Sequence, residues 1–198
     1  DKYFINVQKY DIDFILIWTK SDLIDDEAKE YIEVYKSVGI KSFIISEKAS
    51  DINEYDLLID FLRGKTTALA GVSGVGKSSL INRMCEREHM EVGSLSKKIE
   101  RGKHTTRHSE IFCVDKDTYI YDTPGFSSIE ISDMYEEDLE NYYYEIAELS
   151  GNCKFNKCSH ITEPNCKIKD ALNCGKISKM RYDNYTKIYQ ELKAKRRH

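Results

Sequence analysis

The sequence contains few of the features that would place it outside ordinary globular proteins. It has only 2 prolines, and we find no internal repeat and no low-complexity segment, which argues against repeat arrays and disordered chains. No apolar run is long enough to span a bilayer, and the start does not resemble a signal peptide. The net charge of −4 gives no overall argument for nucleic-acid binding. We therefore expect a cytoplasmic monomer with no membrane partner.

The composition allows one good-sized core and a small appendage. Hydrophobic residues make up 40% of the 198 residues and charged residues 32%, as is usual for soluble globular proteins. The charge is uneven, because basic side chains gather in one segment: Lys97, Lys98, Arg101, Lys103 and Arg107. Six cysteines in a chain that reads as a cytosolic enzyme favour metal binding or reduced thiols over disulfides.

Strand and helix patterns alternate along the first 150 residues, which predicts an α/β fold with a mainly parallel sheet in three layers. The predicted strands cover residues 12–18, 42–45, 66–70, 110–114 and 118–121. The predicted helices cover residues 25–38, 51–63, 77–85, 136–149 and the tail from 177, with a long loop over 86–108. The character changes at Gly151, so we predict an α/β domain over 1–150 and a small domain over 151–198.

A glycine-rich loop follows the predicted strand 66–70 and precedes a predicted helix. Its sequence is Gly71-Val72-Ser73-Gly74-Val75-Gly76-Lys77-Ser78, followed by Ser79. Glycines let backbone N–H groups approach phosphates, and the helix presents its positive end to them. Lys77 is placed to neutralise the β- and γ-phosphates, and Ser78 to ligate Mg²⁺. The alternative is a strand-to-helix turn that binds no ligand.

A candidate base-reading segment comes before this loop in the chain. Thr19-Lys20-Ser21-Asp22 follows the first predicted strand, at the end of a strand where ligands bind in open α/β sheets. The Asp22 carboxylate can accept hydrogen bonds from N1–H and the exocyclic amine of guanine, and the Lys20 stem can lie along the purine. Ser46, at the end of the next strand, is a third candidate contact. A lone Lys-x-Asp is also common on solvated surface.

Asp122-Thr123-Pro124-Gly125 follows the last predicted strand. Asp122 is placed to bind Mg²⁺ through water, and the Gly125 N–H to reach a γ-phosphate. The alternative is an ordinary Pro-Gly turn.

Three cysteines and a histidine lie close together in the second predicted domain: Cys153, Cys158, His160 and Cys166. Three thiolates and one imidazole form a complete tetrahedral set for one structural Zn²⁺. A metal would supply stability that such a short segment cannot obtain from a core of its own. We interpret Cys85 and Cys113 as small core residues and leave Cys174 out of the site. Unligated cysteines or a disulfide are the alternatives.

Together these segments resemble the RsgA family of circularly permuted, small-ribosomal-subunit-dependent GTPases. The matching stretches are TKSDL, GVSGVGKSSLIN, RGKHTT, DTPGF and the cysteine cluster, in the order of that family. The family's N-terminal OB-fold is missing, so we expect the sequence to be part of a longer protein. Thr19 stands where GTPases generally have Asn. Because Thr is shorter and cannot span to neighbouring loops as an amide can, we expect reduced nucleotide affinity or loop rigidity.

The resemblance implies the remaining functional residues. It assigns the orientation of the attacking water to His104, and the sensing of the γ-phosphate and completion of the Mg²⁺ shell to Thr105 or Thr106. It also implies GTP and GDP as ligands, and the small ribosomal subunit and its rRNA as partners in late subunit maturation. Two other readings remain open at this point: a P-loop ATPase or small-molecule kinase with a zinc module, and a zinc RNA-binding module with a structural nucleotide.

Overall fold

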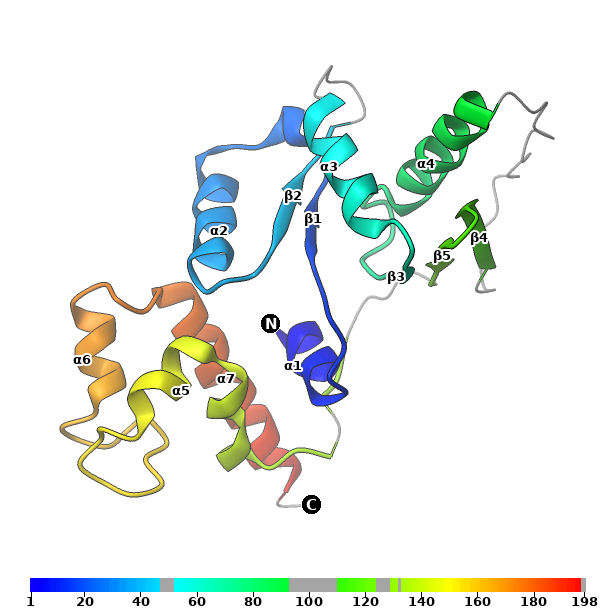
Figure 1. Ribbon diagram of the computed structural model, residues 1–198. Helices are drawn as coiled ribbons and strands as arrows, with labels where there is room; N and C mark the ends of the chain where they lie inside the picture. The colour runs from blue at the N-terminus through cyan, green and yellow to red at the C-terminus, as the bar shows by residue number, and fades with distance from the viewer. Residues whose placement is uncertain (47–51, 93–109, 124–128, 132, 197–198) are drawn as a thin grey trace. The chain divides into compact units, whose positions relative to one another are not determined.

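The computed structural model describes residues 1–46, 52–92, 110–123, 129–131 and 133–196 (Figure 1). The chain forms two compact units, which we call the sheet unit and the helical unit. The sheet unit comprises Leu16–Lys29 and Ser42–Ser128, and the helical unit comprises Asp1–Ile15, Glu30–Lys41 and Ile129–His198. These units divide the chain differently from the two predicted domains, whose boundary at Gly151 stays a prediction.

The sheet unit contains all the strands of the described residues. They are β1 (Leu16–Trp18), β2 (Ser42–Ile44), β3 (Thr66–Leu69), β4 (Glu110–Asp115) and β5 (Thr118–Asp122). β1 pairs with β2 in parallel, β3 pairs with β5 in parallel, and β4 and β5 form an antiparallel hairpin. Parallel pairs need long crossover connections, which the helices between the strands supply. This confirms the predicted alternation of strands and helices and the mainly parallel pairing.

The helices of the sheet unit bury their apolar faces against these strands. α3 (Ile52–Leu62) packs on β2, and α4 (Lys77–Val92) packs on β4 and β5. The most deeply buried side chains include Leu58, Ile81, Met84 and Ile120. α4 continues beyond the predicted end at residue 85, because the following Glu-Arg-Glu-His-Met run contains no helix breaker. The rest of the predicted long loop lies outside the described residues.

One predicted core position in this unit is wrong. Cys85 is buried as predicted, but Cys113 is exposed. Side chains alternate along β4, and Val114 takes the inward position next to Cys113.

The helical unit is built around one apolar cluster. Its elements are α1 (Lys2–Lys9), η2 (the 3₁₀ helix Glu136–Tyr142), α5 (Tyr144–Ser150), α6 (Lys167–Asn173) and α7 (Lys179–Lys195). α2 (Asp26–Ser37) has residues in both units. η2 contacts α1, α5 and α7, and α5 contacts α6. Leu139, Tyr143, Ile146, Ile168 and Tyr185 belong to its core.

The single helix predicted over residues 136–149 is wrong, because the structure divides it at Tyr143. This residue has an extended backbone (φ −118°, ψ 91°) between η2 and α5. The break places the Tyr143 ring fully inside the core, edge-on to Tyr185 with ring centroids 5.4 Å apart. The Tyr143 hydroxyl donates to Asp1 Oδ2 at 3.3 Å. The apolar spacing of the sequence predicts a continuous helix here, but burial of the Tyr143 ring in the core requires an extended residue at this position.

A buried ion network ties three elements of the helical unit together. Arg181 on α7 donates from Nε to Glu145 Oε1 on α5 at 2.8 Å, and from Nη1 to Asp1 Oδ1. Only 4% of the Arg181 side chain and 2% of the Asp1 side chain are exposed. Buried carboxylates at these positions require a paired cation.

We expect Arg181→Met to destabilise the chain by about 3–5 kcal/mol, because it leaves the buried Asp1 carboxylate and the partly buried Glu145 carboxylate without their cation. Lys179→Met is the matched control, since Lys179 lies on the same helix and pairs with Asp183 while 82% exposed. That variant should change the free energy of unfolding by no more than about 0.5 kcal/mol. Urea unfolding followed by circular dichroism measures both, and equal losses would contradict the assignment.

Candidate functional site

The glycine-rich loop lies between β3 and α4, as the sequence predicts. Gly74 and Gly76 have φ values of 77° and 103°, in the left-handed region where glycine carries no steric cost. Lys77, the first residue of α4, donates from Nζ to the carbonyl oxygens of Gly71 (2.8 Å) and Val72 (3.1 Å). The ammonium group is therefore held against the backbone of the loop that is predicted to surround phosphates.

The base-reading segment is hydrogen-bonded to this loop. Thr19 Oγ1 donates to the Val75 carbonyl at 2.6 Å, and Lys20 Nζ donates to the Gly74 carbonyl at 3.0 Å. The expectation that Thr19 is too short to span to a neighbouring loop is therefore wrong. The hydroxyl reaches the loop because the segment after β1 passes close to the Val75 carbonyl. Lys20 itself has a left-handed backbone (φ 58°) and precedes a 3₁₀ turn, η1 (Ser21–Leu23).

Ser46 brings the end of β2 into the same site. Its hydroxyl donates to Asp22 Oδ1 at 3.2 Å, and the Ser21 N–H donates to the Ile45 carbonyl at 3.2 Å. Ser46 is buried. The carboxylate predicted to read the base is thus oriented by a neighbour that the sequence also singled out.

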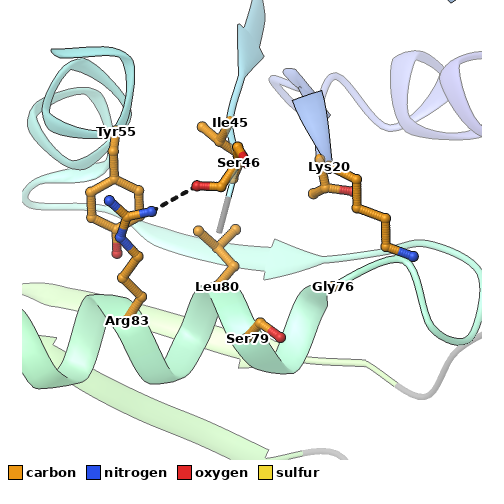
Figure 2. A pocket seen from close by; sticks show the side chains of 9 residues that line it. Lys20, Ile45, Ser46, Tyr55, Gly76, Ser79, Leu80 and Arg83 are labelled. Carbon is orange, nitrogen blue, oxygen red and sulfur yellow. Dashed lines mark hydrogen bonds between the residues drawn. The ribbon is translucent and has the colours of Figure 1, made fainter. Parts of the chain in front are cut away.

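A pocket joins these segments (Figure 2). Predicted residues that line it are Thr19, Lys20, Ser46, Gly76 and Ser79. Tyr55 on α3 and Arg83 on α4 also line the pocket, and sequence analysis missed both. No motif marks them, because their placement depends on how the two helices pack.

Asp122 lies at the end of β5, directly opposite Leu69 at the end of β3. The next residue, Thr123, donates from Oγ1 to the Leu69 carbonyl at 2.7 Å. Asp122 is buried, and it lies beside the strand that leads into the glycine-rich loop. Other predicted residues lie outside the described part of the chain: Gly125, His104, Thr105 and Thr106.

The cysteine and histidine cluster forms in the helical unit as predicted. One ligand atom from each of Cys153, Cys158, His160 and Cys166 lies within 4.8 Å of the others. His160 Nδ1 is 3.6 Å from Cys153 Sγ and 3.4 Å from Cys166 Sγ, and the two sulfurs are 3.9 Å apart. Zn–S bonds of about 2.3 Å and Zn–N bonds of about 2.0 Å in a tetrahedron require about 3.8 Å between sulfurs and about 3.5 Å between sulfur and nitrogen. The atoms of Cys153, His160 and Cys166 therefore fit three corners of a tetrahedral site, and Cys158 Sγ lies within 4.8 Å of them.

Glu140 on η2 supports the cluster from outside. Its Oε2 lies 2.8 Å from His160 Nε2, which leaves Nδ1 facing the three sulfurs. Metal-ligating histidines typically donate their other ring nitrogen to a carboxylate in this way. Sequence analysis missed Glu140, because it lies 20 residues before His160 among other acidic residues.

Burial affects the ionisation of the cluster. Desolvation raises the pKa of Cys158 to about 12, and the neighbouring thiols Cys166 and Cys153 act in the same direction. A thiolate in this position therefore requires a compensating positive charge. Glu163 orders the same loop. Although desolvation opposes the shift, hydrogen bonds from Ser159 and Thr162 lower the pKa of Glu163 to about 2.

The geometry defines a protein class: a P-loop α/β protein whose base-reading segment precedes its phosphate loop, with a Cys₃His cluster near the end. The sequence profile described as RsgA GTPase matches residues 1–132. Small ribosomal subunit biogenesis GTPase RsgA from Agathobacter rectalis is 42% identical over 199 residues, covering 100% of this chain and 65% of the relative. This chain therefore belongs to the RsgA GTPase family.

Two solved structures support the same assignment. The crystal structure of YloQ, described as a circularly permuted GTPase, has a TM-score of 0.73 at 34% identity and covers 98% of this chain. YjeQ from Thermotoga maritima has a TM-score of 0.75 at 31% identity and covers 96%. The fold is thus that of the circularly permuted GTPases, as predicted. The chain spans 62% and 64% of these two proteins. No helix among the described residues is long and apolar enough to cross a membrane.

We expect Thr19→Val to weaken GDP binding about fivefold, because it removes the donor to the Val75 carbonyl at nearly constant volume. Thr19→Ser keeps the hydroxyl and serves as the control, which should bind GDP like the parent chain. Titration with a fluorescent GDP analogue measures both. Equal affinity of the Val and Ser variants would show that the hydrogen bond does not support the site.

Proposed function

We propose that this chain hydrolyses GTP to GDP and phosphate, binds the small ribosomal subunit and its rRNA, and acts in late maturation of that subunit in the cytoplasm. The observation that carries the proposal is the pair of hydrogen bonds from Thr19 and Lys20 to the phosphate loop. They join the segment that carries Asp22, the proposed guanine-reading carboxylate, to the proposed phosphate-binding loop. Family membership supports the ribosomal part, because the relatives are named as small-subunit biogenesis GTPases.

In the proposed site, Asp22 reads the base. The Ser46 hydroxyl donates one hydrogen bond to Asp22 Oδ1. The remaining lone pairs of the Asp22 carboxylate can accept hydrogen bonds from N1–H and the exocyclic amine of guanine. Adenine offers no such pair of donors. The Lys20 stem covers the purine face, while its ammonium group stays on the Gly74 carbonyl.

The phosphates would lie against the loop 71–78. Lys77 would exchange the Gly71 and Val72 carbonyl oxygens for β- and γ-phosphate oxygens, which carry more negative charge. Ser78 and Asp122 are the described residues that would hold Mg²⁺, with Thr105 or Thr106 completing its shell. When bound, Mg²⁺ neutralises charge that develops on the phosphates.

Water activation is assigned to His104. The residue after Gly125 is Phe126, which cannot hydrogen-bond the water that a glutamine orients in many GTPases. An imidazole can orient or deprotonate that water near neutral pH. The basic residues around His104 would contact rRNA phosphates, which would make partner binding weaken steeply with salt.

We expect His104→Ala to leave GTP binding nearly unchanged and to lower the turnover stimulated by small ribosomal subunits about 100-fold or more. His108→Ala, in the same segment, is the matched control and should keep the stimulation. GTP hydrolysis with and without purified small subunits measures both, and also tests the proposed function. Absence of any stimulation in the parent chain would contradict the ribosomal role, and unchanged stimulation in His104→Ala would contradict the residue assignment.

In the helical unit, Cys153, Cys158, His160 and Cys166 would hold one structural Zn²⁺. All four ligands come from the protein, so no position is open for water and the ion has no catalytic role. The bound ion would stabilise the thiolates and cross-link the loop over residues 153–166.

We expect Cys158→Ser to lose zinc and Cys174→Ser to keep it. Cys174 is exposed, and its Sγ donates to the Ala171 carbonyl at 3.3 Å instead of joining the cluster. Metal analysis of the purified variants by mass spectrometry, together with thermal unfolding, measures the difference. Loss of zinc only from the Cys174 variant would refute the ligand set.

A further inference from the structure

Arg83 on α4 contacts two other elements of the pocket and has no part in the mechanism above. Its guanidinium carbon lies 4.0 Å from the centre of the Tyr55 ring on α3. Its Nη1 donates to the Ser46 carbonyl, at the end of β2, at 3.0 Å (Figure 2). One side chain therefore links α4, α3 and the segment after β2.

The Tyr55 ring restricts the orientation of the guanidinium plane. Tyr55 is 2% exposed, so packing holds its ring in place. A planar guanidinium stacked on an aromatic face loses little further freedom when it also donates a hydrogen bond. The Arg83 donor is thus directed at Ser46 by a rigid support, which a flexible surface arginine would lack.

Ser46 passes this constraint to the base-reading carboxylate. Its carbonyl accepts from Arg83, while its hydroxyl donates to Asp22 Oδ1 at 3.2 Å. The same helix begins at Lys77, the predicted phosphate-binding lysine. The phosphate-binding and base-reading parts of the site therefore share one rigid element.

We propose that Arg83 is a positioning residue that sets the guanine selectivity of the site by holding Ser46 against Asp22. This inference rests on the proposed function, because it concerns the same nucleotide pocket. The ligand is a guanine nucleoside diphosphate or triphosphate. Arg83 acts through Ser46 and Asp22 and does not itself contact the base in this proposal.

The test compares GDP with IDP, whose base lacks the exocyclic amine. The ratio of their dissociation constants measures the hydrogen bond from that amine to Asp22. Arg83→Met keeps an unbranched stem and removes the donor. We expect it to weaken GDP binding about tenfold and IDP binding much less, so that the selectivity ratio falls. Equal weakening of both nucleotides, or an unchanged ratio, would overturn the proposal.

Three further measurements keep the result interpretable. Arg83→Lys keeps the charge, but an ammonium group cannot both stack on the Tyr55 ring and direct a donor at Ser46, so the GDP-to-IDP selectivity of this variant should also fall. The Lys variant provides the same test if the Met variant does not fold. Thermal unfolding of each variant shows whether the fold is intact. The parent chain is also titrated with ADP. A parent chain without preference for GDP over ADP would contradict the proposed function itself, whereas a guanine-selective parent with an unaffected Met variant would contradict only the role of Arg83.

Discussion

The candidate site of the sheet unit depends on the hydrogen bond between the Thr19 hydroxyl and the Val75 carbonyl. The two residues are 56 positions apart, and the bond closes the base-reading segment onto the phosphate loop. Together with the hydrogen bond from Lys20 to the Gly74 carbonyl, it joins two loops that lie at the ends of two different strands. A loop held at the correct distance before the ligand arrives loses less conformational freedom on binding, which favours affinity. The two segments therefore meet in space although they are far apart in the chain.

The helical unit depends on a different constraint, the convergence of four ligand atoms from one short loop. Cys158 and Cys166 also belong to its apolar core, which joins η2, α5, α6 and α7. Two contacts fix His160 in the loop over residues 153–166. Glu140 contacts the His160 ring, and the Tyr182 hydroxyl donates to the His160 carbonyl at 2.7 Å. An ion bound here would therefore stabilise the packing of the helices as well as the loop.

Local patterns predicted much of this arrangement. The glycines and lysine of the phosphate loop must be consecutive, because they shape one turn around one ligand, so the motif is visible in the sequence. The same holds for the Cys₃His set, whose members lie within 14 residues. Predictions from hydrophobic periodicity were wrong at two positions where tertiary packing sets the conformation. The predicted helix is interrupted at Tyr143, whose ring lies in the core, and Cys113 is exposed on β4. The residues missed in the site, Arg83, Tyr55 and Glu140, have partners at least 20 positions away.

The sequence by itself determined which residues are candidates for the chemistry: a glycine-rich loop for phosphates, a carboxylate for a base, and a tetrahedral set of soft ligands. Each depends on residue types at short spacing, which the covalent chain sets directly. Only the tertiary structure decided how these parts are held. It showed that the Thr19 hydroxyl reaches the glycine-rich loop, that the Ser46 hydroxyl donates to Asp22, and that Arg83 donates to the Ser46 carbonyl. The physical reason is that hydrogen bonds between distant segments depend on the packing of strands and helices, which no local spacing encodes.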